Sequence, residues 1–499
     1  MISQLKLKPE GFMKAKHSVL IENVLLTLCA GFLLFGDIRH YLFLPYTDNE
    51  GAFVLLGREM GRGARLYADL WDHKPPLLFV QSWLMQLVFP LTEFRLHLYA
   101  FFIHALNAFL IFGLAKRLAF SRWGAWASVL AYALLLIPPL FQTWTVEADL
   151  LIQPFLLLSF WAAFSKNGWL HFLSGVLWAA AFFTKQSALF ILPVYLMAGA
   201  FSDIPKILKW WTGAVLATAA VLLPFALDGR WADFYSALIG FNQHYIEKGW
   251  LFFFATPAFR DFLVQWAKVA GCVYGFVFLF SVLGSIGKFS KPLHPRTLFF
   301  LAVWLLGVLA SCCVSGYFFT YYFIALLPPL ALGMGLDWMK LTQTRRLDLT
   351  VCFLLIAAGA LALATNTGGL KDKVFAYAQY PWPRYFADKA VGMAIAGEAK
   401  PEDKLLAWSD DPQVYVYAGL SPSVKTPFIN HLDGRPADAL KTLSDFDRQP
   451  PRYCVVSRMD QVIQPSPWFE TQLRDRYTRV KSMENLDLYR LGSANHILK

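Results

Sequence analysis

The chain has 499 residues, of which 57% are hydrophobic, 17% are aromatic and only 16% are charged. This composition excludes an ordinary soluble domain and is typical of a protein that crosses a membrane many times. The formal net charge of +11 does not indicate a nucleic-acid partner, because the basic residues cluster in short gaps between apolar runs. The positive-inside rule places basic residues in such gaps.

The apolar runs predict a polytopic α-helical membrane protein with eleven crossings. A helix needs roughly 20 residues to span the bilayer. The first crossing follows a cytoplasmic tail, residues 1–17, and no signal-peptide cleavage site follows it. The crossings are residues 18–36, 95–117, 123–141, 149–165, 169–184, 187–201, 208–227, 262–287, 297–315, 319–336 and 349–365.

Residues 76–90 are apolar but too short to cross, and we interpret them as an interfacial or re-entrant helix. With this interpretation every predicted inner gap is basic and, with the tail, these gaps hold sixteen Lys and Arg residues. A crossing at 76–90 would invert all of these gaps against the positive-inside bias. The predicted membrane domain therefore covers residues 18–365, with outer loops at 37–76 and 228–261.

Residues 366–499 differ in composition from the rest of the chain. They contain 34 charged residues among 134, about twice the density found elsewhere. The segments LLAWSDDPQVYVYAG and RYCVVS predict strands, and residues 383–399 and 469–476 predict helices. We therefore expect a soluble α/β domain on the periplasmic or extracellular side of a plasma (inner) membrane.

The first predicted outer loop is unusually polar for a segment beside a membrane. Residues 46–76 carry five acids and four bases. Asp48 or Glu50 is a candidate general base, because a positioned carboxylate can deprotonate the hydroxyl of an acceptor substrate. The same residues fit a capping box, with Thr47 as N-cap and Glu50 at the third helical position. Spacing alone leaves both interpretations open.

Two further groups carry charge at the predicted outer face. Lys74 follows Asp72 and His73, and a lysine at the membrane surface can hold a phosphate as a point charge. Lys185 lies between apolar runs, where a lysine at the centre of the bilayer costs roughly 3 kcal/mol. A turn at this position would remove that cost and leave the charge free to bind phosphate. Simple loop formation at Asp72–Lys74 and snorkelling of Lys185 are the alternatives.

Other candidates lie at predicted outer ends of helices. Glu147 and Asp149, in TWTVEADLL, either cap the incoming helix or contribute to a site. Tyr321 and Tyr322, in GYFFTYYF, belong either to an aromatic belt or to a substrate contact.

Several of these segments share the pattern of one known family. TDNEGAFVLLGREMGRGARLYADLWDHKPPLLF has an acid pair, a Gly about seven residues on, a Tyr-x-Asp and an acidic-x-Lys-Pro-Pro run. TKQSALF, YYFIALLPPLAL, LLAWSDDPQVYVYAG and PRYCVVS follow as weaker landmarks in the expected order. Over nearly its whole length the chain resembles the GT-C membrane glycosyltransferases. It is most similar to the bacterial branch related to protein O-mannosyltransferases and lipid A aminoarabinose transferases.

The resemblance implies a GT-C fold and an inverting transfer from a polyprenyl-phosphate sugar to an outer-face acceptor. It assigns the base to Asp48 and the donor phosphate to Lys74 and Lys185. Relatives often read Asp-Glu where this chain has Asn49-Glu50, so the base is Asp48 or Glu50. Relatives also often have His-Tyr where this chain has Tyr321-Tyr322.

The remaining expectations concern substrates and cofactors. The predicted substrate-binding set also includes Asp72, His73, Glu147, Tyr321 and Tyr322. Some GT-C enzymes bind a divalent metal, for which Asp48, Glu50, Glu147 and Asp149 offer oxygen ligands; we assign no metal site. The expected partners are a lipid-linked sugar donor, a cell-envelope glycan, lipid or protein acceptor, and membrane lipids. A lipid-linked glycan ligase or polymerase, a transporter and a silent scaffold are the alternatives.

Overall fold

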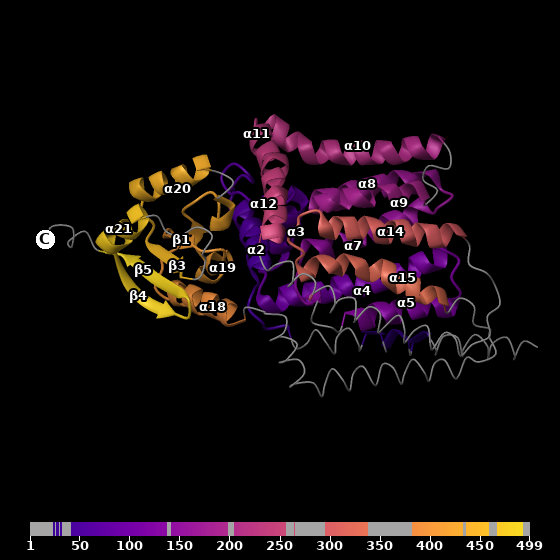
Figure 1. Cartoon of the computed structure of the whole chain (residues 1–499), viewed down its shortest axis with the longest axis horizontal. Coiled ribbons are helices and arrows are strands. Elements are labelled where there is room, and N and C mark those ends of the chain that lie inside the picture. Colours follow the sequence, from indigo (N-terminus) through magenta and orange to yellow (C-terminus); the bar gives the residue numbers. More distant parts are fainter. Residues whose placement is uncertain are drawn as a thin grey trace, which may run out of the picture.

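The protein is seen in a computed structural model that describes residues 41–136, 141–197, 204–255, 295–337, 382–432, 436–458 and 467–492, with most of 23–31 and position 264. Figure 1 shows a helical bundle and an α/β unit side by side along the longest axis. The predicted crossings at 262–287 and 349–365, and most of the one at 18–36, lie outside the described residues. The count of eleven crossings therefore stays a prediction.

Most helices of the bundle run roughly parallel to one another (Figure 1). Among the described residues, three helices are long and apolar enough to cross a membrane: Glu93–Arg117, Ile204–Leu227 and Arg296–Cys313. These match predicted crossings to within a few residues. The bundle helices are α4 (Glu93–Arg117), α5 (Arg122–Leu135), α7 (Gln153–Ala163), α8 (Gly168–Thr184), α9 (Leu192–Met197), α10 (Ile204–Leu227), α14 (Pro295–Cys313) and α15 (Leu327–Asp337).

Three predicted crossings begin with irregular helical turns. The crossing at 149–165 starts with the short helix α6 (Ala148–Leu151) before α7. The crossings at 187–201 and 319–336 start with the 3-10 helices η2 (Gln186–Ile191) and η4 (Thr320–Leu326). Because these turns occupy the first residues of each predicted crossing, the regular helices that follow them are shorter than the crossings. Polar residues lie where the turns begin.

The first predicted outer loop contains one regular helix and leads into a second. Helix α2 (Asp48–Gly61) begins at N-cap Thr47, and the predicted capping box with Glu50 is present. Helix α3 (Pro76–Val88) has proline at its first position, as helix starts favour. Its 13 residues span about 20 Å, less than the ~30 Å hydrocarbon core. Its assignment as a helix that does not cross stays a prediction.

The predicted outer loop 228–261 is largely helical where it is described. It forms α11 (Trp231–Tyr235), the π-helical turn η3 (Ser236–Gly240) and α12 (Phe241–Ala255). Phe234 and Phe241 are buried, so apolar packing stabilises these helices. The assignment of the segment to the outer face stays a prediction. In Figure 1, α12 runs across the direction of the bundle helices near the α/β unit.

Helices α8 and α10 approach closely at two glycines. A Cβ atom on Gly175 would lie 2.0 Å from the carbonyl oxygen of Trp210, and one on Gly213 would lie 2.1 Å from that of Phe172. Small residues at helix contacts are the usual means of close packing between membrane helices. The two glycines therefore fix the distance between α8 and α10.

Replacing Gly175 by Ala is expected to lower the free energy of unfolding by about 1–3 kcal/mol, because an added methyl group forces the two backbones apart. The measurement is the midpoint of thermal unfolding in detergent. Gly333→Ala is the matched control, since a Cβ atom on Gly333 of α15 meets nothing within 4 Å. Equal midpoints for the two variants would contradict the close contact.

The α/β unit is built on a five-stranded mixed sheet of order β2-β1-β3-β5-β4. β1 (Lys404–Trp408) pairs in parallel with β2 (Ser421–Pro422) and β3 (Tyr453–Ser457), while β5 (Leu486–Leu491) pairs antiparallel with β3 and with β4 (Tyr477–Met483). The helices of this unit are α18 (Trp382–Ala396), α19 (Gln413–Ala418), η7 (Ile429–Leu432), α20 (Pro436–Arg448) and α21 (Pro467–Arg476). Of the two segments predicted as strands, the start of LLAWSDDPQVYVYAG lies in β1 and RYCVVS contains β3. The helices predicted at 383–399 and 469–476 correspond to α18 and α21.

One predicted strand was wrong. Residues 413–418 form helix α19, although the alternation VYVY suggested a strand. Pro412 provides the N-cap position, and Gly419 ends the helix with φ of 70°, a left-handed conformation that glycine adopts readily. Val414 and Tyr415 are buried, and short apolar runs do not distinguish strand from helix by period.

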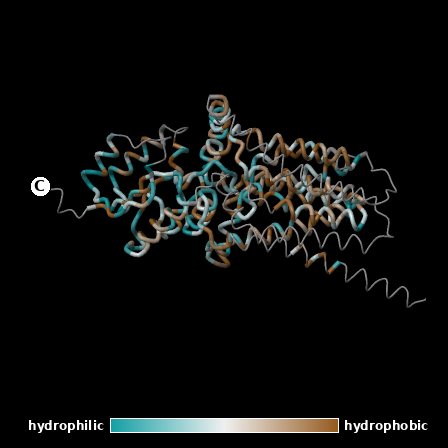
Figure 2. The backbone as a smooth tube through the Cα atoms, turned by 60° about the horizontal axis from the view of Figure 1, so that its bottom comes forward, coloured by the Kyte–Doolittle hydropathy of each residue, from teal (hydrophilic) through white to brown (hydrophobic). Residues whose placement is uncertain are grey.

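The α/β unit docks directly on the first loop. Backbone carbonyl oxygens of Tyr415 and Leu420 accept hydrogen bonds from the Arg58 guanidinium at 3.2 and 2.6 Å. A Cβ atom on Gly51 of α2 would lie 2.5 Å from the backbone nitrogen of Gln413, so α2 and α19 are in close contact. Figure 2 shows the change from a mainly hydrophobic bundle to a more hydrophilic α/β unit across this junction.

Candidate functional site

The polar residues of the first loop lie at one end of the bundle. The Lys- and Arg-containing gaps between the predicted crossings lie at the other end. α4 begins at Glu93, which bonds Lys389 of the α/β unit at 2.8 Å. It contains 25 residues and ends at Arg117, about 36 Å away. The Arg117 guanidinium lies over Trp161 near the end of α7, with 4.4 Å to the ring centroid. This separation agrees with the predicted assignment of polar and basic gaps to different faces of the membrane.

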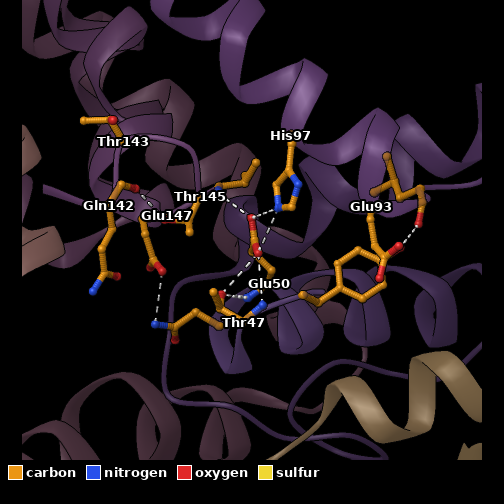
Figure 3. Close-up of polar contacts among 12 residues, drawn as sticks. Thr47, Glu50, Glu93, His97, Gln142, Thr143, Thr145 and Glu147 are labelled. Carbon is orange, nitrogen blue, oxygen red and sulfur yellow. Dashed lines mark hydrogen bonds and ion pairs between the residues drawn. The ribbon is translucent and has the colours of Figure 1, made fainter. Parts of the chain in front are cut away.

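Glu50 is fully buried, and its carboxylate is enclosed by protein partners (Figure 3). It accepts hydrogen bonds from the backbone N–H groups of Thr47 at 3.0 Å and Val146 at 2.9 Å, and it pairs with Nε2 of His97 at 3.3 Å. Burial alone would raise the pKa of Glu50, but His97 and these hydrogen bonds outweigh burial and lower it. These contacts tie α2 to α4 and to the turn before α6.

Asp48 is half-buried at the first position of α2. Its Oδ1 accepts the N–H of Asn49 at 2.9 Å, and it forms no ion pair among the described residues. Burial raises the pKa of Asp48, against the lowering effects of this hydrogen bond and of the charges of Arg384 and Lys74. Asp48 is thus a partly accessible carboxylate with an elevated proton affinity, as a general base requires.

Glu147 lies beside Asp48 and is bridged to the first loop. Asn49 Nδ2 donates to Glu147 Oε1 at 3.4 Å, and the Asn49 side chain also lies near the Tyr321 hydroxyl. Burial raises the pKa of Glu147 well above its ordinary value, and the negative charges of Asp48, Glu50 and Asp149 raise it further. Glu147 is therefore held next to Asp48 in a form that retains its proton more readily than an ordinary glutamate.

The Asp72, His73 and Lys74 group forms a tight turn before α3. Fully buried Asp72 accepts the Lys74 N–H at 2.9 Å, and Lys74 Nζ lies 3.4 Å from Asp72 Oδ2. Burial alone would raise the pKa of Asp72, but Lys74, His73 and His431 lower it to about 2. Burial, reinforced by Lys74, lowers the pKa of His73 to about 4. At neutral pH Asp72 is charged and His73 is neutral.

This turn is joined to two other elements through one backbone group. The carbonyl oxygen of His73 accepts hydrogen bonds from Nε2 of Gln186 and Nδ2 of Asn242, both at 3.1 Å. Gln186 begins η2 and Asn242 lies in α12. The Lys74 turn is therefore held at the same place as the Lys185 turn.

Lys185 lies at the break between α8 and η2, where a turn was expected. Its ammonium group forms an ion pair with Asp149 of α6 and lies 4.2 Å from the ring centroid of Tyr322. The hydroxyl of Tyr322 lies near that of Tyr245 of α12. Lys185, Tyr321 and Tyr322, separated in sequence, thus join the cluster around Asp48 and Lys74.

The α/β unit adds charged residues that sequence reasoning missed. Arg384 Nε pairs with Asp411 Oδ1 at 2.7 Å, and Gln413 Nε2 donates to Asp388 Oδ2 at 2.6 Å. The charge of Arg384 reaches Asp48 and lowers its pKa. No local pattern marks these residues. His97 was also missed, although an ionisable residue inside an apolar helix is itself a signal of a special role.

The divalent metal left open by the sequence gains no support. Within the described ranges, no group of three or more His, Cys, Asp or Glu side chains is arranged to hold a metal ion. Of the four acids considered, Glu50 is taken up by Thr47, Val146 and His97, and Asp149 is paired with Lys185.

The chain combines an apolar helical bundle with a polar cluster at one end of the bundle and an α/β unit over that end. No protein-family model and no curated protein sequence matches the chain. Among solved structures, it is similar to ArnT from Cupriavidus metallidurans, a lipid A aminoarabinose transferase solved with undecaprenyl phosphate bound. The identity is 12%, the TM-score is 0.58, and the match covers 96% of this chain and 99% of that chain. The chain therefore has the GT-C fold of membrane glycosyltransferases.

A second similar structure is the arabinofuranosyltransferase AftD from mycobacteria. The identity is 13%, the TM-score is 0.45, and the match covers 94% of this chain and 41% of that chain. The assignment of the fold rests on the first comparison.

Proposed function

We propose that this chain is an integral-membrane glycosyltransferase that moves a sugar from a polyprenyl-phosphate donor to an acceptor, with inversion at the anomeric carbon. The observation that carries the proposal is the gathering of one half-buried carboxylate without an ion-pair partner among the described residues, Asp48, with two lysines, Lys74 and Lys185, at one end of the bundle. The undecaprenyl phosphate bound by ArnT, which has the same fold, supports a donor of this kind.

The proposed reaction is a single displacement. Asp48 takes the proton of the acceptor hydroxyl as its oxygen attacks the anomeric carbon. The bond from that carbon to the phosphate oxygen breaks, and the phosphate leaves with the electron pair. Lys74 and Lys185 stabilise the charge on the leaving phosphate. Attack opposite the leaving group inverts the configuration.

Asp48 is a better base than Glu50 in this structure. Asp48 is half-buried and unpaired among the described residues, whereas Glu50 is fully buried and bonded by Thr47, Val146 and His97. A general base must come within hydrogen-bond reach of the acceptor hydroxyl. We therefore assign the catalytic role to Asp48 and a supporting structural role to Glu50.

The remaining predicted residues take roles around the donor. Asp72 and His73 hold the turn that presents Lys74. Glu147, Tyr321 and Tyr322 line the same cluster and are proposed to contact the substrate. The proposed location is the plasma membrane, with the basic gaps inside and the α/β unit outside. The acceptor is a glycan, lipid or protein of the cell envelope.

A lipid-linked glycan ligase or polymerase is the nearest alternative, because it shares the architecture and differs in the size of the donor. A transporter is less consistent with the site, since transporters place polar residues near the bilayer midplane. Here the described cluster lies at one end of the bundle, at the junction with the α/β unit.

The test is transfer by purified protein in lipid. Polyprenyl phosphates carrying different radiolabelled monosaccharides are incubated with an envelope extract as acceptor. Label transferred from one of these donors is the expected result. Transfer only from donors with oligosaccharides would favour the ligase or polymerase. Donor binding without transfer from either kind of donor would contradict the enzyme and favour the transporter.

A further inference from the structure

One segment of the α/β unit lies against the Lys74 turn. We call residues 425–431 the contact segment. The N–H of Trp71 donates to the carbonyl oxygen of Lys425 at 2.8 Å. The Lys425 ammonium group pairs with Asp233 of α11 at 3.2 Å. The contact segment is therefore held between the first loop and a membrane-proximal helix.

Phe428 of this segment lies under the proposed phosphate-binding lysine. Lys74 Nζ is 5.4 Å from the centroid of the Phe428 ring. The ring is buried, while the Lys74 side chain keeps 22% of its exposure. A cation over an aromatic face is attracted to it, and more strongly where water is excluded. Phe428 and Asp72 thus hold the lysine from two sides and leave its side chain partly exposed.

His431 fixes the aromatic groups around this lysine. Its ring meets that of His73 edge-to-face, with 4.8 Å between centroids and 90° between planes. It also contacts Trp71 at 5.7 Å and Phe428 at 4.8 Å. His431 therefore packs between the turn that carries Lys74 and the ring beneath Lys74.

The contact segment is anchored to the end of strand β1. The Asn430 N–H donates to Asp410 Oδ1 at 2.9 Å, and the Ile429 N–H lies 3.5 Å from the Ser409 carbonyl oxygen. Ser409 and Asp410 directly follow β1. Residues that follow the carboxyl ends of parallel strands are common positions for ligand sites.

We propose that the α/β unit forms part of the donor-phosphate site, with Phe428 and His431 as positioning residues for Lys74. This inference rests on the proposed role of Lys74 in binding the donor phosphate. It gives the α/β unit a direct effect on the donor, apart from any effect on the acceptor.

The test compares Phe428→Leu with wild type in two measurements, the Kd for undecaprenyl phosphate and the kinetics of transfer. Phe428→Leu is expected to raise the Kd and the donor KM about threefold to tenfold, and to lower kcat as well, because Lys74 also stabilises the leaving phosphate. Phe428→Tyr, which keeps an aromatic face, is expected to retain wild-type affinity. It also keeps the test valid if the leucine variant folds poorly.

Phe446→Leu is the matched control. Phe446 is buried in the same α/β unit, but its ring packs on Phe469 and Tyr477, with 5.0 and 5.8 Å between ring centroids. These three residues belong to a hydrophobic cluster that does not include Phe428. It is expected to leave the Kd unchanged. Equal effects of Phe428→Leu and Phe446→Leu would overturn the proposal, because general loosening of the unit would then explain both.

A double-mutant cycle with Lys74→Gln separates this inference from the proposed function. Lys74→Gln alone is expected to weaken binding of undecaprenyl phosphate, and Phe428→Leu is then expected to add nothing. If Phe428→Leu raises the Kd as much in the Lys74→Gln background as in wild type, Phe428 does not act by positioning Lys74. That result would leave the proposed function intact. Unchanged binding by Lys74→Gln itself would overturn the phosphate role of Lys74 and this proposal with it.

Discussion

Asp48→Asn is expected to lower kcat for sugar transfer by about 10²- to 10⁴-fold, the usual contribution of a general base. The amide has the shape of the carboxylate and retains an oxygen that can accept the Asn49 N–H bonded to Asp48 at 2.9 Å, so folding should persist. It cannot take a proton from the acceptor. The measurement is kcat at saturating donor, together with the Kd for undecaprenyl phosphate, which should change little.

Asp69→Asn is the control for this variant. Asp69 lies in the same loop but pairs with Arg65 at 2.8 Å in an exposed position, and its replacement should leave kcat unchanged. If Asp48→Asn retains most of the wild-type kcat, Asp48 is not the base. Loss of kcat in a folded Glu50→Gln variant, with Asp48→Asn active, would move the role to Glu50.

The pH profile provides a second check on Asp48. Burial raises its pKa above the ordinary value of 3.8, and a base acts only when deprotonated. The acid limb of the kcat/KM profile is therefore expected to fall at a pH above that value, and Asp48→Asn should remove it.

Glu50→Ala is expected to lower the free energy of unfolding by about 3–5 kcal/mol, the usual result of removing one partner of a buried ion pair. The change leaves His97 without its partner and the N–H groups of Thr47 and Val146 without their acceptor in a dry interior. The measurement is chemical or thermal unfolding in detergent. Asp69→Ala, which removes an exposed ion pair, is expected to cost less than about 1 kcal/mol.

The same contacts predict how stability depends on pH. Because the pKa of Glu50 is lowered in the folded protein, its stabilising contribution is complete above the ordinary value of 4.5. It is lost as the pH falls from that value through the folded pKa. The free energy of unfolding of the wild type is expected to fall slightly in this acid range, and that of Glu50→Ala is not.

Equal free energies of unfolding of the Glu50→Ala and Asp69→Ala variants would show that Glu50 has no structural role.

Local patterns in the sequence predicted much of the fold. The apolar runs predicted α4, α8, α10 and α14, and the Thr47–Glu50 spacing predicted the cap of α2. Pro75 and Pro76 predicted the start of α3. These features depend on hydrophobic period and on hydrogen bonds within one turn, and both are recorded in neighbouring residues. The same rules failed for α19, where packing overrode an ambiguous local pattern.

The sequence by itself also identified most residues of the candidate site, including Asp48, Lys74, Lys185 and Glu147, because charge beside apolar runs requires an explanation. Only the tertiary structure decided how they differ. It buried Glu50 against His97, left Asp48 partly accessible, and brought Arg384 and Phe428 to the first loop. Such contacts join residues that lie from 47 to more than 300 positions apart in the sequence. They are set by how whole helices and the sheet pack, which no local pattern encodes.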